Sequence, residues 1–264
     1  MDSTSHALRG ALRPQSAATH GRPGLLVAGA TGVLGAEVLR RLAGSGRFGH
    51  TQVMAREPMT TGVQGVSILL AADTPPEDWL ASAGATVGVV MFEPPRLYYD
   101  RERALWTPAP EQLAALARWF RRCGVQTLVM VMPHIQGRLP EALKSGLATL
   151  DEHAVAAVGF ERVLFVRSAQ KGQAPKPAGF FRQTAAWMLS TLSYMVPVSE
   201  QPVRPSKIAE FIEAALRVLP PGTHVASPEL LWQAAQSSGK GLHVESIHSV
   251  VQAWLNGRLD ASRP

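Results

Sequence analysis

The sequence predicts an α/β protein built on a doubly wound parallel sheet, with a small, mainly helical cap toward its carboxyl-terminal end. Three observations support this fold class. An apolar run that begins at Gly24 ends in a glycine-rich turn and passes directly into an amphipathic helix. Further short apolar runs alternate with helical patterns as far as Val166, which is typical of parallel strands joined by right-handed crossovers. After about residue 168 this alternation gives way to mainly helical patterns.

The first strand is expected over residues 25–28, and it is followed by the glycine-rich turn Gly29-Ala-Thr-Gly32-Val-Leu-Gly35. Glycines at a strand-to-helix junction let the backbone approach a pyrophosphate closely, and the start of the helix supplies free N–H groups and a partial positive charge. A turn of the same shape without a ligand is the alternative. The pattern therefore predicts a phosphate-binding turn made by Gly29, Thr31, Gly32, Val33, Leu34 and Gly35.

The remaining elements follow from periodicity and from turn residues. Further strands are expected at 51–55, 66–71, 86–92, 126–132 and 162–166. Helices are expected after the turn, at 74–83 behind a capping box at Thr74–Glu77, from 110 through 120, and at 140–158. A polar loop over 96–109 separates the fourth strand from the next helix. The cap is expected to hold a basic loop at 171–177, an amphipathic segment at 180–195, a helix at 206–218, a short strand at 223–226 and helices at 228–236 and 245–259.

Composition limits the classes of protein that the chain can belong to. With 264 residues, 46% of them hydrophobic, and no linker, residues 24–264 are expected to form one domain. Residues 1–23 are predicted to be a disordered basic arm, with an organelle transit peptide as the alternative. The net charge of +6 is spread along the chain, so neither nucleic-acid binding nor a membrane span is expected. The single cysteine, Cys123, excludes an internal disulfide and fits a cytoplasmic protein.

The spacing G-x-x-G-x-x-G at residues 29–35 resembles the signature of the extended and atypical short-chain dehydrogenase/reductase superfamily, which includes NmrA-like and NAD-dependent epimerase-like proteins. The resemblance implies an NAD(P)-binding Rossmann fold with substrate specificity in the cap. In this fold the end of the second strand selects the cofactor, and Arg56 there favours the 2′-phosphate of NADP, whereas a one-residue shift would place Glu57 there and favour NAD. Asp73 would lie beside the adenine or cap a helix, and Phe92 is also assigned to the cofactor site.

The same resemblance implies a serine after the fifth strand and a Tyr-x-x-x-Lys motif on the next helix, because the lysine stabilises the phenolate of the tyrosine. Neither the serine nor the tyrosine is present. The fifth strand ends at Met132-Pro133-His134, and Pro140 stands four residues before Lys144. The substitutes considered for the proton relay are His134, Lys144 and Tyr99. No histidine has a Cys, Asp or Glu at metal-ligand spacing, so no metal site is predicted.

Three functions remain open on these grounds. The first is an NADP(H)-binding protein that has lost the usual relay and acts as a dinucleotide-sensing, regulatory or assembly protein. The second is an NADP-dependent oxidoreductase that acts on a small carbonyl substrate with a substituted acid such as His134. The third is a scaffold whose site has decayed. The expected partners are the dinucleotide and an unidentified small molecule or protein. The helices around 113–120 and 143–154 either form a homodimer bundle or face the sheet.

Overall fold

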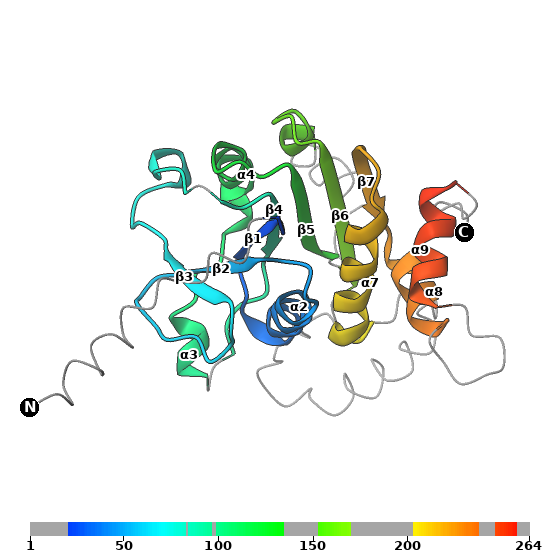
Figure 1. The fold of residues 1–264 in the computed structure, drawn as a ribbon, viewed down its shortest axis with the longest axis horizontal. Helices are drawn as coiled ribbons and strands as arrows, with labels where there is room; N and C mark the ends of the chain where they lie inside the picture. The colour runs from blue at the N-terminus through cyan, green and yellow to red at the C-terminus, as the bar shows by residue number, and fades with distance from the viewer. Residues whose placement is uncertain are drawn as a thin grey trace, which may run out of the picture.

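The computed structural model describes residues 21–82, 84–96, 99–134, 153–169, 203–237 and 246–257. Its centre is a seven-stranded, all-parallel sheet with the strand order β3-β2-β1-β4-β5-β6-β7 (Figure 1). The strands are β1 (Gly24–Ala28), β2 (His50–Ala55), β3 (Val66–Leu70), β4 (Val87–Met91), β5 (Thr127–His134), β6 (Arg162–Ala169) and β7 (Gly222–Ala226). The order reverses between β1 and β4, which is the topological switch of a Rossmann-type sheet. The doubly wound fold predicted from the sequence is confirmed.

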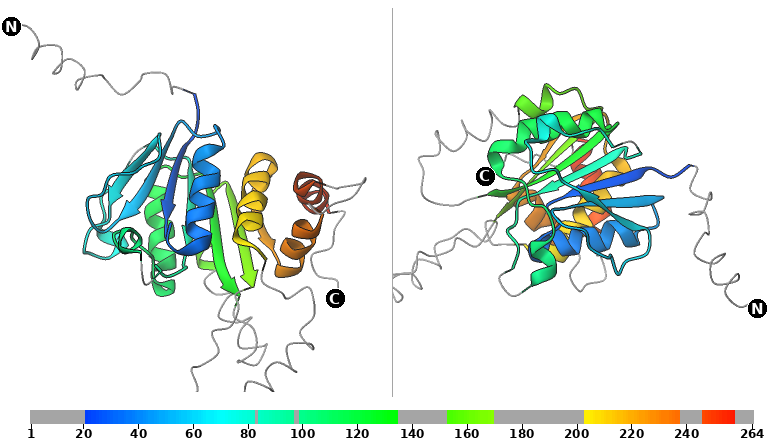
Figure 2. Two further views of the ribbon diagram at one scale, coloured as in Figure 1. Left: turned by 90° about the horizontal axis from the view of Figure 1, so that it is seen from below. Right: turned by 90° about the vertical axis from the view of Figure 1, so that its left-hand side faces the viewer.

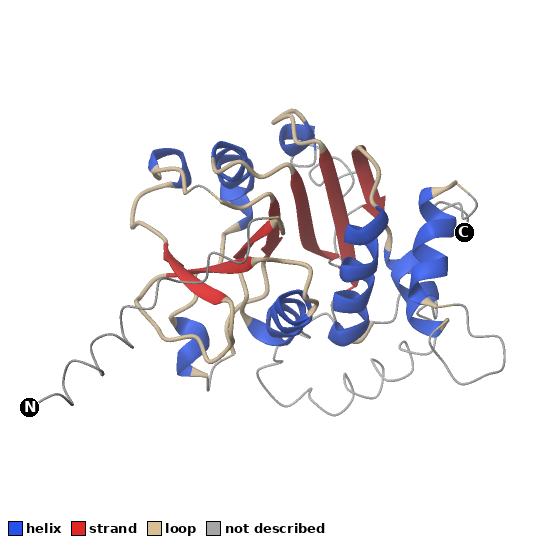
Figure 3. Ribbon diagram, in the orientation of Figure 1, coloured by secondary structure: helices blue, strands red, loops and turns tan. Residues whose placement is uncertain are grey.

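Helices cover both faces of the sheet (Figures 2 and 3). On one face, α2 (Gly32–Gly44) lies beside α7 (Pro205–Val218), and α8 (Pro228–Gln236) and α9 (Ile247–Leu255) pack next to α7. On the other face lies α4 (Leu113–Arg122), preceded by the 3-10 turn η3 (Pro110–Gln112). Because alternate residues of each strand point to opposite faces, the two faces have separate apolar cores, one under α2 and α7 and one under α4.

The carboxyl-terminal region extends the sheet further than the sequence indicated. We expected the alternation to stop after the sixth strand. Instead α7 is a crossover helix, and β7 pairs in parallel with β6, from Arg162 opposite Gly222 to Val166 opposite Ala226. The expected helical character is present in α8 and α9. The basic loop at 171–177 and the segment at 180–195 lie outside the described residues, as do residues 1–20 of the expected arm.

Two connections differ from expectation. The helix expected over 74–83 is only a 3-10 turn, η2 (Pro76–Asp78), and Pro75 stands at its cap position without a side-chain hydrogen bond, so the predicted capping box is wrong. The expected polar loop after β4 contains a one-turn helix, α3 (Asp100–Arg103).

The apolar side of α4 faces the sheet, with Leu116 and Phe120 fully buried. None of the helices that the structure describes is long and apolar enough to cross a membrane.

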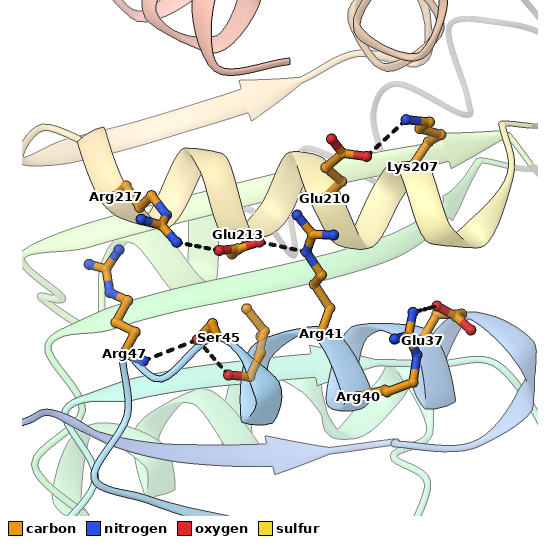
Figure 4. A network of polar contacts seen from close by, with 10 residues as sticks. Glu37, Arg40, Arg41, Ser45, Arg47, Lys207, Glu210, Glu213 and Arg217 are labelled. Atoms are coloured by element: carbon orange, nitrogen blue, oxygen red, sulfur yellow. Dashed lines mark hydrogen bonds and ion pairs between the residues drawn. The ribbon is translucent and has the colours of Figure 1, made fainter. Parts of the chain in front are cut away.

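A buried carboxylate joins α2 to α7 (Figure 4). Glu213, whose side chain is 8% exposed, accepts hydrogen bonds from Arg41 and Arg217, both at 2.5 Å. Burial alone would raise the pKa of Glu213, but the hydrogen bonds and charges of the two arginines outweigh burial and hold the pKa below its ordinary value. The charged carboxylate therefore stabilises the packing of the two helices.

We expect Glu213→Gln to lower the free energy of unfolding by about 1.5–3 kcal/mol at pH 7, because two charge-assisted hydrogen bonds weaken. Denaturant unfolding followed by circular dichroism measures the change. The matched control is Glu37→Gln, which breaks an exposed pair with Arg40 on α2 and should change the stability by about 0–0.5 kcal/mol. Equal effects of the two substitutions would contradict a stabilising role for the Glu213 cluster.

Candidate functional site

The candidate site is the turn between β1 and α2. It lies at the carboxyl-terminal ends of the strands, where the strand order reverses. Gly29 and Gly32 adopt the left-handed conformation, with φ of +74° and +72°. A Cβ atom at Gly29 would collide with the main-chain carbonyl of Met91 on β4, and one at Gly35 would collide with the backbone of Ala30. The glycine spacing is therefore already required by close packing of the turn against β4 and against itself.

The N–H groups that would face a phosphate are occupied by carboxylates of the same chain. The amide of Gly32 donates to Oε2 of Glu102 at 3.1 Å, and the amide of Leu34 donates to Oε2 of Glu93 at 2.6 Å. Glu93 lies two residues beyond β4, and Glu102 lies on α3, which is placed beside the turn (Figures 1 and 2). The positive end of α2 thus binds two negative charges, as it would in an anion complex.

Thr31 attaches the turn to the connection between β4 and α4. Its hydroxyl donates to the main-chain carbonyl of Glu93, and its Oγ1 lies 3.0 Å from Oγ1 of Thr107. Thr31 stands at the cap position of α2, yet its side chain makes no capping bond to the helix. Its hydroxyl holds the β4–α4 connection in place.

Glu102 is fixed from two sides. Besides the Gly32 amide, it accepts hydrogen bonds from the main-chain N–H of Arg96 at 3.0 Å and from the Arg96 guanidinium, whose Nε is 2.7 Å from Oε1. Burial alone would raise the pKa of Glu102, whose side chain is only 9% exposed. The hydrogen bonds from Arg96 and Gly32 outweigh burial, and the pKa lies below its ordinary value. Glu102 is therefore charged at neutral pH.

The chain after α3 is hydrogen-bonded to the carboxyl-terminal ends of β1 and β2. The main-chain carbonyl of Ala104 accepts from the Arg56 amide at 2.7 Å, and the Trp106 amide donates to the carbonyl of Met54 at 3.0 Å. The carbonyl of Trp106 accepts from the Gly29 amide at 3.1 Å. In a Rossmann fold the adenosine ribose of a dinucleotide lies beside the end of the second strand. Here the chain itself occupies that position.

Trp106 fixes this segment to the core. Its side chain is 8% exposed, and its ring lies edge-on to Trp79 at 5.1 Å between centroids; Trp79 in turn meets Trp119 of α4 at 5.1 Å. Edge-to-face pairs of this kind contribute about 0.5–1.5 kcal/mol beyond area burial. The segment is thus held by polar contacts at one end and by an aromatic cluster at the other.

In this arrangement the residues do not fit a bound dinucleotide. Two carboxylates occupy the amides that would receive the pyrophosphate, and a third negative group placed there would be repelled by both. Residues 104–106 are hydrogen-bonded to the ends of β1 and β2, beside which the adenosine would lie.

The predicted cofactor residues are placed as follows. The glycines and Thr31, Val33 and Leu34 form the turn as expected, with Thr31 buried and Val33 45% exposed. Arg56 and Glu57 are both exposed just beyond β2. Asp73 is exposed after β3 and caps no helix. Phe92 packs against the core under α4.

Of the three predicted catalytic residues, the structure describes Tyr99 and the backbone of His134. Tyr99 is 52% exposed, and the Arg96 guanidinium stacks on its ring at 3.8 Å. His134 is the last residue of β5, paired in register with Ala169 of β6. Lys144 and Pro140 lie outside the described residues. Within the described ranges, no group of three His, Cys, Asp or Glu residues could hold a metal ion.

Sequence reasoning missed the residues that occupy the turn. The sequence pattern assigns Glu93 to no site, and it places Glu102 and Trp106 only in the polar loop expected over 96–109. One signal was available. A carboxylate two residues beyond β4 lies at the carboxyl edge of the sheet, next to the phosphate-binding turn of β1.

Comparison with known proteins gives structural likeness only. No family model and no curated protein matches the sequence. A nucleoside-diphosphate-sugar epimerase from Staphylococcus aureus is 14% identical, with 90% of this chain and 91% of that chain covered and a TM-score of 0.47. Triphenylmethane reductase from Citrobacter sp., solved with NADP(H), is 15% identical, with 76% and 68% covered and a TM-score of 0.46. Uronate dehydrogenase from Agrobacterium tumefaciens is 16% identical, with 77% and 75% covered and a TM-score of 0.46.

We expect Gly32→Ala to destabilise the fold by about 2–3 kcal/mol, because the left-handed backbone is strained and the new Cβ would collide with the Glu93 side chain. Thermal and denaturant unfolding measure the loss. Gly44→Ala, where a Cβ meets open space, is the control and should be nearly neutral. In a Glu93→Ala background the cost of Gly32→Ala should fall, and an unchanged cost would show that Glu93 does not lie on Gly32.

Glu102→Gln should lower the stability by about 1.5–3 kcal/mol at pH 7. Because the pKa of Glu102 is depressed in the folded state, its contribution is present above the ordinary value of 4.5 and is lost as the pH falls through the lower folded value. The stability difference between the wild type and Glu102→Gln should therefore be constant from pH 7 to 5 and shrink below pH 4.5. A difference that grows in acid would overturn the assignment of a charged, hydrogen-bonded Glu102.

Proposed function

We propose that this chain is a regulatory or assembly protein that uses a Rossmann-type fold without catalysing hydride transfer. The observation that supports this most strongly is the closure of the crevice at the β1–β4 switch by the chain itself. Glu93 and Glu102 bind the amides of the glycine turn, and residues 104–106 are hydrogen-bonded to the ends of β1 and β2.

The absence of the expected relay residues supports the same proposal. Reduction of a carbonyl needs a nicotinamide beside the substrate and a proton donor about 3 Å from the carbonyl oxygen. The sequence has Pro133-His134 at the end of the fifth strand and Pro140 where the superfamily it resembles has its tyrosine. The described charged neighbour of Tyr99 is the Arg96 guanidinium, which lies over the face of its ring and is already paired with Glu102. An NADP-dependent oxidoreductase therefore has less support than a non-catalytic role.

In this proposal a dinucleotide is a ligand that shifts a conformational equilibrium, and NADP(H) is preferred to NAD(H). Arg56 is the basis of that preference, because it is exposed just past β2, where a guanidinium can pair with a 2′-phosphate. The output would pass to a protein or small-molecule partner in the cytoplasm, which is consistent with the single, buried Cys123.

Titration of the purified chain with NADPH and NADH, followed by nucleotide fluorescence, tests the proposal. We expect weak binding, with dissociation constants above the micromolar range, and no oxidation of NADPH by a panel of aldehydes, ketones and quinones. Turnover with any of these carbonyl compounds would overturn the non-catalytic role, and loss of that turnover in His134→Ala would then identify the acid.

We also expect Arg56→Glu to weaken NADPH binding about tenfold or more while leaving NADH binding nearly unchanged, because only NADPH carries the 2′-phosphate. Glu57→Gln is the matched control and should affect both nucleotides equally. Equal losses for NADPH and NADH in Arg56→Glu would remove the preference for NADP.

A further inference from the structure

We propose that the crevice segment, defined as residues 93–96 and 99–107, is an internal competitor of nucleotide: it occupies the glycine turn with carboxylates and must leave before a diphosphate-containing nucleotide can bind. This inference rests on the proposed function, because it describes how the closed crevice is regulated. It assigns Glu93 and Glu102 as the groups that imitate the ligand.

The two carboxylates reproduce the chemistry of a diphosphate. A diphosphate bridge offers oxygen acceptors and about two negative charges to the start of a helix. Glu93 and Glu102 also offer acceptor oxygens, at 2.6 Å from the Leu34 amide and 3.1 Å from the Gly32 amide in the first turn of α2. Gly32 has no side chain, and the space this leaves is filled by the Glu93 carboxyl group. In other turns of this kind, the glycine at this position leaves space for a phosphate. Here the space at Gly32 is taken by the Glu93 carboxylate.

The main chain of the segment reproduces a second part of the ligand. Its carbonyls at Ala104 and Trp106 accept from the amides of Arg56 and Gly29, at the tips of β2 and β1. If the segment left alone, the amides of Gly29, Gly32, Leu34 and Arg56 would all lose their acceptors. Opening exchanges these hydrogen bonds for bonds to water, and an anionic ligand then supplies charge-assisted acceptors, so the ligand stabilises the open form. Release of the segment and arrival of an anionic ligand are therefore coupled.

The segment has the properties of a unit that can open locally. It contains a single helical turn, α3, and the side chains of Tyr99, Asp100 and Arg101 on it are exposed. Its apolar anchor is Trp106, which leaves the contact with Trp79 when the segment opens. Short, exposed units of this type open at a smaller free-energy cost than the whole domain. Because only the open form binds, the measured affinity is the intrinsic affinity reduced by the open fraction.

The first experiment compares the affinities of the wild type and of Glu93→Gln/Glu102→Gln for NADPH, ADP and adenosine by calorimetry. We expect the double variant to bind NADPH and ADP about tenfold more tightly or better, because neutral amides hold the segment less strongly and repel phosphate less. Adenosine, which lacks the diphosphate, should gain much less. Glu111→Gln, an exposed change on η3 outside the segment, is the matched control and should leave all three affinities unchanged.

The second experiment separates release of the segment from simple loss of charge. The background is the double-glutamine chain, in which Cys123→Ala also removes the native cysteine. Two further substitutions, Thr31→Cys and Thr107→Cys, then replace hydroxyls whose oxygens lie 3.0 Å apart, close enough for a disulfide. When oxidised, this lock should abolish the gain in NADPH and ADP affinity, and dithiothreitol should restore it. Equal affinities in the oxidised and reduced forms would overturn the proposal, because the nucleotide would then bind with the segment in place.

A spectroscopic readout follows the segment without measuring affinity. With fluorine-labelled tryptophan, the resonance of Trp106, assigned by Trp106→Phe, should shift when NADPH is added, since Trp106 leaves Trp79. An unchanged Trp106 resonance at saturating NADPH would contradict release. Carbonyl turnover is measured in the same samples. Turnover together with an affinity gain would contradict the non-catalytic role and support the internal competitor. No turnover and no affinity gain would support the non-catalytic role and contradict the internal competitor.

Discussion

The closed site depends on charge-assisted hydrogen bonds between two carboxylates and the first amides of α2. The start of a helix carries unsatisfied donors and a partial positive charge, so an anion placed there is stabilised. Glu93 and Glu102 supply that anion from the connection after β4. The other contacts follow from these two, since Arg96 is held by Glu102 and Thr31 by the backbone of Glu93. The glycine turn therefore organises a loop of its own chain in place of a bound molecule.

Most of the fold could be predicted from local patterns. The apolar runs at β1 and β4 are buried on both faces, and residues 25–28 and 86–92 show this directly in the sequence. The place of α7 and β7 was harder to predict. A helix that packs beside α2 and a helix of a cap have the same apolar periodicity, and only the pairing of β7 with β6 distinguishes them. Pairing between distant strands is not encoded in any short window.

The site was predictable only in part, for a related reason. The turn itself is local, and its glycines were identified correctly. Its occupants are 59 and 70 residues away from the amides that they bind, and no spacing rule connects them. Gly32 is equally necessary whether a phosphate or the Glu93 carboxyl group lies against it. The glycine signature thus reports the shape of the turn, and the identity of its ligand is decided by the loop after β4.

The tethering of Glu93 and Glu102 also affects how the chain is maintained in the cell. A protein stabilised by a free ligand becomes less stable when the ligand concentration falls, because the stabilisation follows mass action. A tethered group is present at a constant effective concentration, on the order of millimolar for short connections. Glu93 is such a group, since it follows β4 by two residues and reaches the Leu34 amide at 2.6 Å. The folded chain therefore keeps the stabilisation supplied by these two carboxylates at any nucleotide concentration.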